Sequence, residues 1–142
     1  MLEHVMAGLV VCVTVLVLAS AYGVLHRRRS GRMRVHGRDD GKRLGAAELG
    51  DGLGERATLV QFSSAFCAPC RATRRILTEV AAMVPGVTHV EIDAEQRLEL
   101  VRALDILKTP TVLVLDADGR IVRRATGQPR KADVIAALGE AV

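Results

Sequence analysis

The sequence contains few aromatic residues and few cysteines, and these shortages exclude several classes of protein. Of its 142 residues, one is tyrosine, two are phenylalanine, none is tryptophan and three are cysteine. Three cysteines are too few for a disulfide-dense secreted scaffold, and 142 residues are too few for a large multidomain enzyme. Because 49% of the residues are hydrophobic and 25% are charged, the chain still has enough apolar surface to fold.

Basic charge is confined to one short segment of the chain. The net charge is +4, but residues 27–38 hold six arginines and no acidic residue, whereas residues 39–142 hold 14 basic and 15 acidic residues. A nucleic-acid-binding domain needs its basic charge spread over a folded face, usually together with exposed aromatic side chains. We therefore expect no nucleic-acid partner.

Motifs for metal, phosphate and nucleophilic-serine chemistry are also missing. The chain has no HExxH, GxSxG or Walker pattern, and its histidines (His4, His26, His36 and His89) form no pair of metal ligands. Its single CxxC supplies half of a zinc site, so a zinc shared between two chains remains an alternative. The glycine-rich stretch at residues 50–54 precedes a predicted strand, whereas a phosphate cradle needs a following helix. We expect no metal and no cofactor.

One long apolar run lies near the start of the chain, after a four-residue tail (residues 1–4). Val5–Leu25 comprises 21 residues without a charge. As a helix it would be roughly 31 Å long, which matches the hydrocarbon thickness of a bilayer. We predict a single transmembrane helix, with Tyr22 near one interface, and we interpret Cys12 as a small apolar residue within it. The lipid bilayer is then a partner of the chain.

The charges beside this run predict its orientation. No Lys or Arg precedes the run, whereas Arg27, Arg28 and Arg29 follow it directly. Basic residues next to a span stay on the cytoplasmic side, so we predict a single-pass cell-membrane protein with residues 27–142 in the cytoplasm. A cleaved signal peptide is the alternative, because residues 19–21 resemble a small-residue cleavage site.

The remaining chain reads as a linker followed by one α/β domain. Residues 26–43 are polar and interrupted by glycines, with a short strand at Met33–His36, and the domain covers residues 44–142. The apolar spacing predicts these elements: helix Ala46–Leu49, strand Thr58–Ser63, helix Ala68–Val84, strand Val87–Asp93, helix Glu95–Leu104, strand Thr111–Leu115, strand Arg120–Thr126 and helix Arg130–Ala141. Helices that alternate with strands, ending in a hairpin around residues 116–119, favour a mixed β-sheet flanked by helices. In the last strand we expect Ile121 and Ala125 on the same face.

The motif Cys67-Ala68-Pro69-Cys70 stands where a buried strand is followed by a helix. Cysteines three residues apart in the first helical turn are close enough for a disulfide. The helix N-terminus carries unpaired N–H groups and partial positive charge, which favour the thiolate form of Cys67 and make it the nucleophile. Cys70 is better shielded and suits the resolving thiol. Pro69 has no N–H to lose there and stiffens the loop. After a strand in a βαβ pattern, the motif indicates redox chemistry.

At this point the chain resembles the thioredoxin family over about residues 44–142. The segments that carry the likeness are TLVQFSSAFCAPCRATRRIL, VEIDAE and LKTPTVLVLDADGRIVRRATG. The resemblance implies a thioredoxin-like fold, with Cys67 attacking and Cys70 resolving. It also implies a cis peptide bond at Thr109–Pro110 beside the disulfide, where backbone groups bind an extended substrate. From the residues alone, the alternative is a trans proline that begins the strand Thr111–Leu115.

The sequence departs from the family pattern at several positions. Phe66 replaces a usual tryptophan and Ala68 a usual glycine; both keep the loop apolar, and we count them with Pro69 as residues that shape the site. Gln61 stands where many thioredoxins have a buried aspartate, and an amide cannot take the proton of the second cysteine. His89 lies near the family's partner lysine for that aspartate, and is either a candidate proton acceptor or a structural strand histidine.

These observations predict a membrane-tethered thiol–disulfide oxidoreductase of the protein-disulfide reductase type that uses the Cys67–Cys70 couple. Its partners would be protein disulfide or thiol clients and an external reductant. One alternative is a non-catalytic thioredoxin-like interaction module at the membrane. Another is the same chemistry in the extracytoplasmic space, in the maintenance of cytochrome or envelope thiols.

Overall fold

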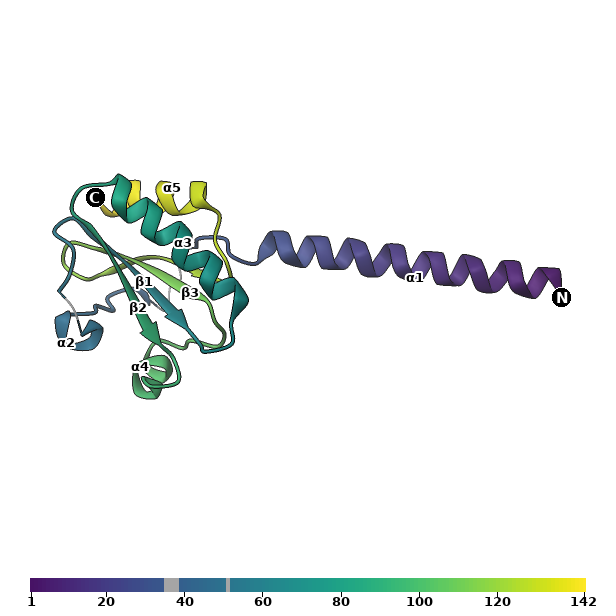
Figure 1. The fold of residues 1–142 in the computed structure, drawn as a ribbon, viewed down its shortest axis with the longest axis horizontal. Coiled ribbons are helices and arrows are strands. Elements are labelled where there is room, and N and C mark those ends of the chain that lie inside the picture. Colours follow the sequence, from purple (N-terminus) through teal and green to yellow (C-terminus); the bar gives the residue numbers. More distant parts are fainter. Residues whose placement is uncertain (35–38, 51) are drawn as a thin grey trace.

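The computed structural model describes residues 1–34, 39–50 and 52–142, which form one long helix followed by an α/β domain (Figure 1). Helix α1 (Leu2–Arg29) projects away from the domain, and none of its residues is buried. By length and composition α1 is suited to cross a membrane, and a signal sequence near the N-terminus would meet the same criteria. Cys12 is an exposed free cysteine on this helix.

The domain is built on a mixed four-stranded sheet with the strand order β2-β1-β3-β4. β1 (Ala57–Ser63) runs parallel to β2 (Val87–Asp93), and helix α3 (Ala68–Met83) connects them. β3 (Thr111–Asp116) is antiparallel to β1 and to β4 (Ile121–Thr126). All residues of β1 are buried, because it lies inside the sheet with helices on both faces. The predicted mixed sheet is confirmed. Because β1 and β2 are parallel, α3 must return the chain from the end of β1 to the start of β2, and the β1–α3 connection therefore lies at one end of the sheet.

Two helical layers cover the sheet (Figure 1). On one face, α3 and α5 (Lys131–Ala141) pack over a cluster that includes Leu59, Leu77 and Val134. On the other face, α2 (Ala46–Leu49) and α4 (Leu98–Ala103) cover a second cluster with Val60 and Phe62 at its centre. Successive side chains of a strand point to opposite faces, so the apolar run of β1 supplies both clusters.

Helix α4 is shorter at its start than the apolar spacing predicts. It begins at Leu98 rather than Glu95. The Oδ1 atom of Asp93 accepts a hydrogen bond from the backbone N–H of Glu95 at 2.9 Å. An aspartate that binds the backbone two residues on stabilises a turn instead of a helix, so the chain turns once after β2 before α4 starts.

Strand β4 contains an irregularity that overturns the predicted pattern of its faces. Leu115 pairs with Ile121, whereas its neighbour Val114 pairs with Arg123, which leaves Val122 as an extra residue. A bulge of this kind reverses the alternation of side chains beyond it. Ile121 therefore packs on the α2–α4 face and Ala125 on the α3–α5 face, so placing them on the same face was wrong.

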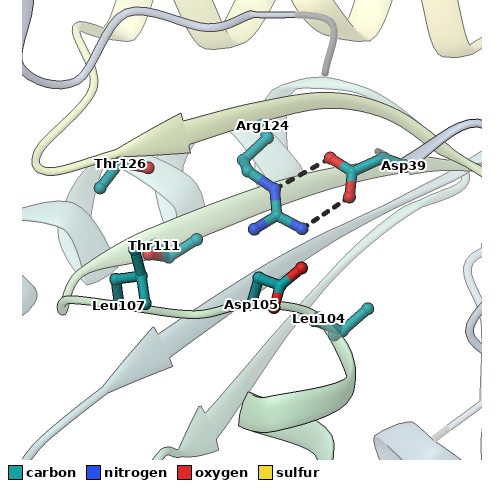
Figure 2. A pocket seen from close by; sticks show the side chains of 7 residues that line it. All are labelled: Asp39, Leu104, Asp105, Leu107, Thr111, Arg124 and Thr126. Atoms are coloured by element: carbon teal, nitrogen blue, oxygen red, sulfur yellow. Dashed lines mark hydrogen bonds and ion pairs between the residues drawn. The ribbon is translucent and has the colours of Figure 1, made fainter. Parts of the chain in front are cut away.

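The described parts of the predicted linker lie against strand β4. Arg34 and Arg124 exchange backbone hydrogen bonds of 2.7 and 2.8 Å. Residues 35 and 36 of the strand predicted at Met33–His36 lie outside the described residues. Asp39 and the Arg124 side chain form two hydrogen bonds, of 2.9 and 2.7 Å, beside a small pocket (Figure 2). Asp39 is 3% and Arg124 7% exposed, so this ion pair holds the segment to the sheet.

Candidate functional site

The two cysteines of the CxxC motif lie where β1 is followed by α3. Residues 64–66 turn the chain away from the sheet, and Cys67 is the N-cap residue of α3. Pro69 occupies the first turn of the helix, where its missing N–H leaves no hydrogen bond unmade. Cys67 and Cys70 form a disulfide with a Cα–Cα distance of 5.2 Å. The Cys67 Sγ atom also accepts a hydrogen bond of 3.2 Å from the Cys70 N–H, so its sulfur lies among the unpaired N–H groups of the helix end.

Exposure distinguishes the two sulfurs. Cys67 is half-buried, whereas Cys70 is 2% exposed beneath the first turn of α3. Beside them, the Phe66 side chain is fully exposed, and Ala68 and Pro69 are exposed as well. The half-buried Cys67 therefore adjoins a small exposed surface of apolar side chains, whereas Cys70 is covered by the domain.

A second loop borders the disulfide. The Thr109–Pro110 peptide bond is cis, as the resemblance implied. Ser64 Oγ and Thr109 Oγ1 are 2.9 Å apart and share a hydrogen bond, which joins this loop to the β1–α3 connection. Leu107, in the same loop, is 93% exposed. Leu107 instead lines the small pocket beside Arg124. Sequence reasoning missed Ser64, because a serine in a loop carries no signal of its own.

Gln61 lies on β1, below the first turn of α3. Its side chain is fully buried. The Nε2 group donates hydrogen bonds to the Cys70 carbonyl oxygen at 2.8 Å and to Ser63 Oγ at 2.9 Å. The Oε1 atom is buried without a hydrogen-bond partner among the described residues. The amide therefore supports the backbone of Cys70, and no proton can be transferred to it.

His89 is not brought together with the disulfide. It lies on β2 opposite Leu59, and its Nδ1 atom is 3.3 Å from the hydroxyl of Thr78. Thr78 follows Cys70 by eight residues on α3, which corresponds to about 12 Å along a helix. Burial lowers the pKa of His89, and the nearby Glu91 carboxylate opposes that change only in part. The pKa of Glu91 is itself lowered, mainly by its hydrogen bonds from Arg74.

This arrangement has the parts that thiol–disulfide exchange requires and no described metal-binding group. An accessible sulfur lies at a helix N-terminus, a second sulfur lies within bonding distance, and a cis-proline loop flanks the pair. In the described ranges, no three His, Cys, Asp or Glu side chains gather where they would bind a metal ion. The fold and the site together define a thiol–disulfide oxidoreductase.

Comparisons with known proteins agree with this class. The Thioredoxin family profile matches residues 48–140. Thioredoxins of Mycobacterium bovis and Mycobacterium tuberculosis are 30% identical over 88 residues, which are 61% of this chain and 75% of theirs. Thioredoxin of Alicyclobacillus acidocaldarius is 32% identical over 88 residues, covering 61% of this chain and 83% of the relative.

Solved structures show the same fold. Chloroplastic thioredoxin z gives a TM-score of 0.55 at 27% identity and covers 61% of this chain and 79% of its own. Thioredoxin from Trypanosoma brucei brucei gives a TM-score of 0.53 at 22% identity, over 61% of this chain and 75% of its own, which shows the fold alone. The chain belongs to the thioredoxin family and carries thiol–disulfide oxidoreductase activity.

Proposed function

We propose that the protein is a membrane-tethered protein-disulfide reductase whose domain faces the cytoplasm. The observation that carries this proposal is the Cys67–Cys70 pair at the N-terminus of α3, in a domain that directly follows a long apolar helix. Clients are proteins with an accessible disulfide, and an external dithiol reductant restores the couple. Phe66, Ala68, Pro69 and the Thr109–Pro110 loop form the surface that the client contacts.

The reaction is a two-step exchange. The Cys67 thiolate attacks one sulfur of the client disulfide, so a mixed disulfide forms and the first client thiolate leaves. The Cys70 thiolate then attacks the Cys67 sulfur, releases the second client thiolate and leaves the Cys67–Cys70 disulfide. The client gains two electrons, and its two thiolates take protons from solvent. An external dithiol then supplies two electrons and two protons to reduce the Cys67–Cys70 disulfide.

The second step needs a proton acceptor for Cys70. In this chain Gln61 supplies a hydrogen-bond donor to the Cys70 backbone instead of a carboxylate. Water that enters when the client loosens the first turn of α3 is therefore the acceptor in this proposal. The consequence is a slow resolving step, and mixed disulfides with clients have long lifetimes.

The membrane part of the proposal depends on α1 and the charges that follow it. Three consecutive arginines form the last turn of α1, and its single acidic residue, Glu3, is in the first turn. Basic residues beside a span remain in the cytoplasm, which supports a cytoplasmic domain. Arginines at this position also favour anionic headgroups, by about 1 kcal/mol each.

Cysteine variants of the full chain test the chemistry. The Cys67→Ser variant should lose insulin reduction by more than about a hundredfold, because no other accessible sulfur lies at the helix end. Cys12→Ser is the matched control and should retain the wild-type rate. The Cys70→Ser variant should accumulate mixed disulfides with clients. If Cys67→Ser reduced insulin at the wild-type rate, or if partners were retained equally without both cysteines, the domain would be an interaction module.

A topology reporter tests the orientation. Alkaline phosphatase fused after Val142 should be inactive in intact cells, and a fluorescent reporter that folds in the cytoplasm should be active there. The opposite pair of results would place the same chemistry in the extracytoplasmic space.

A further inference from the structure

The groove beside the disulfide is bordered at its other end by the membrane helix. This site groove has a volume of about 600 Å³. Pro69, Thr109 and Pro110 line it on the disulfide side, and Arg27 and Ser30 line it where α1 ends. Residues 127–131, from the end of β4 to the first residue of α5, also line it, together with Ile76 and Lys108. A client segment that lies along this groove therefore extends from Pro69, two residues after Cys67, toward the last turn of α1.

Close backbone contacts fix the end of α1 at this position. The Gly31 N–H donates a hydrogen bond of 2.7 Å to the Thr126 carbonyl, and the Gly127 N–H donates one of 2.7 Å to the Pro110 carbonyl. A Cβ atom on Gly31 would lie 1.9 Å from the carbonyl oxygen of Gln128, so the two segments are in direct contact. The path from Pro110 to Ser30, the C-cap residue of α1, crosses these two hydrogen bonds and two peptide units, Thr126–Gly127 and Ser30–Gly31. Pro110 therefore lies within roughly 20 Å of the end of α1.

The chain after α1 does not act as a free tether. Arg34 pairs with Arg124 of β4 through two backbone hydrogen bonds, and Asp39 forms the buried ion pair with the same residue. A flexible linker would let the domain move tens of ångströms from the bilayer. Here these contacts must break before the domain can leave the end of α1.

The charge of the site groove is positive. Among the described residues that line it, Arg27, Lys108, Arg130 and Lys131 are basic and none is acidic. Arg130 is paired with Asp133 and Lys131 with Glu79. Arg27 and Lys108 form no ion pair with any acid in the described part of the chain. Unpaired cations along a groove favour an acidic segment and disfavour a basic one.

We infer that the client disulfide lies in an extended, acidic segment directly beside the membrane span of another integral membrane protein. This inference rests on the proposed function, because it uses α1 as the membrane anchor and Cys67 as the nucleophile. The site groove is open to a chain that leaves the bilayer next to α1, and its reactive end lies close to the headgroup layer. The exchange reaction is the one written above.

Single-span reporter proteins test this inference in nanodiscs that contain the full, pre-reduced chain. One reporter carries a cystine loop about five residues from its span, and another carries it beyond a stiff proline-rich spacer of about 20 residues, roughly 60 Å away. In a single turnover, the near disulfide should be reduced at least about tenfold faster than the far one. The near loop with acidic flanks should also react several-fold faster than one with lysine flanks, and added salt should narrow this difference.

Two variants separate a docked domain from a free one. A Gly/Ser insertion of about 25 residues after Arg29 extends the reach by roughly 25–30 Å and should reduce the near-to-far ratio to about twofold. Gly31→Ala should also lower this ratio, because its Cβ would collide with the Gln128 carbonyl oxygen and separate the end of α1 from the domain. Gly41→Ala is the control, since Gly41 also has a positive φ but has nothing within 4 Å of its Cβ position, and it should keep the wild-type ratio.

Soluble insulin distinguishes failure of the inference from failure of the proposed function. Reduction of insulin by the wild type and by the insertion variant, without any preference for the near disulfide, would overturn the inference and leave the reductase intact. Equal or faster reduction of the lysine-flanked loop would overturn the acidic client. Failure to reduce both insulin and the reporters would instead contradict the proposed function.

Discussion

At the scale of single residues, the position of Cys67 gives its sulfur two properties that the other cysteines lack. Cys12 is exposed, but it lies in the middle of α1, where the backbone N–H groups are already bonded within the helix. Cys70 lies in the first turn of α3 but is buried. Cys67 is both accessible and at the helix N-terminus, and this combination favours an attacking thiolate.

Gln61 is the residue at which a single substitution should change the kinetics. Gln61→Glu places a carboxyl group beside Cys70, so we expect the mixed disulfide with a client to resolve at least about tenfold faster at neutral pH, because the carboxylate accepts the thiol proton. The decay of a trapped client complex measures this. Gln61→Met is the control of similar size without a proton acceptor, and equal decay in the two variants would contradict the prediction.

The same substitution should make stability depend on pH. Burial raises the pKa of a carboxyl group above its ordinary value of about 4.3. The stability of Gln61→Glu should therefore be fully present below that value and decrease as the pH rises through the raised pKa of the folded state. The difference in unfolding temperature between Gln61→Glu and Gln61→Met, measured at several pH values, tests this. A difference that does not change with pH would show that the carboxyl group is solvated and would contradict the prediction.

His89 should contribute an acid-dependent loss of stability. Its pKa is lowered in the folded protein because the imidazole is buried. Below about pH 6.5 the unfolded chain takes up a proton that the folded chain does not, so stability falls as the pH falls toward the lowered pKa. His89→Gln should remove this part of the pH dependence. Unfolding temperatures between about pH 5 and 7.5 test it, and identical slopes in both proteins would contradict it.

At the scale of elements, one buried ion pair joins the segment after α1 to β4. Asp39→Ala leaves the buried Arg124 guanidinium without its partner, and breaking such a pair costs about 3–5 kcal/mol. We expect the unfolding temperature of the domain to fall by more than about 10 °C, as followed by circular dichroism. The double variant Asp39→Leu with Arg124→Met should recover most of the loss, and an unchanged Asp39→Ala protein would contradict the structural role.

The elements of the domain were largely predictable from apolar spacing, and the exceptions have local causes. β2 matches the prediction at both ends, because its alternation and the Pro85–Gly86 break are explicit in the sequence. The start of α4 was not predictable from spacing, because the Asp93 side chain decides it. The bulge at Val122 was not predictable either, since it depends on how β3 and β4 pair and not on either strand alone.

At the scale of the whole molecule, α1 and the domain are separate units of stability. No residue of α1 is buried, so a chain that lacks residues 1–28 should keep its unfolding temperature within a few degrees and its insulin reduction within about twofold. Loss of folding or of insulin reduction in this truncated chain would show that α1 is part of the domain. The same truncation should abolish membrane association in a flotation assay.

The composition of the site was predictable, but its surroundings were not. Local spacing in CAPC after a strand identified the cysteine pair, whereas the loop at Thr109-Pro110 was identified by the resemblance to the thioredoxin family and not by spacing. Ser64 joins the site through its hydrogen bond with Thr109, which depends on the tertiary fold. The position of Arg27 and Ser30 along the site groove depends on how residues 30–34 pack against β4, which no local pattern indicates.

The reactivity of the Cys67–Cys70 pair is measured by site-resolved alkylation of the reduced full chain as a function of pH. Cys67 should react first, with a midpoint below the ordinary cysteine value of about 8.5, because the helix N-terminus favours its thiolate, and Cys70 should stay protected until the domain unfolds. Oxidation should then join the same two sulfurs in one chain. If both thiols instead reacted with the ordinary midpoint and formed no bond with each other, the domain would not be an oxidoreductase.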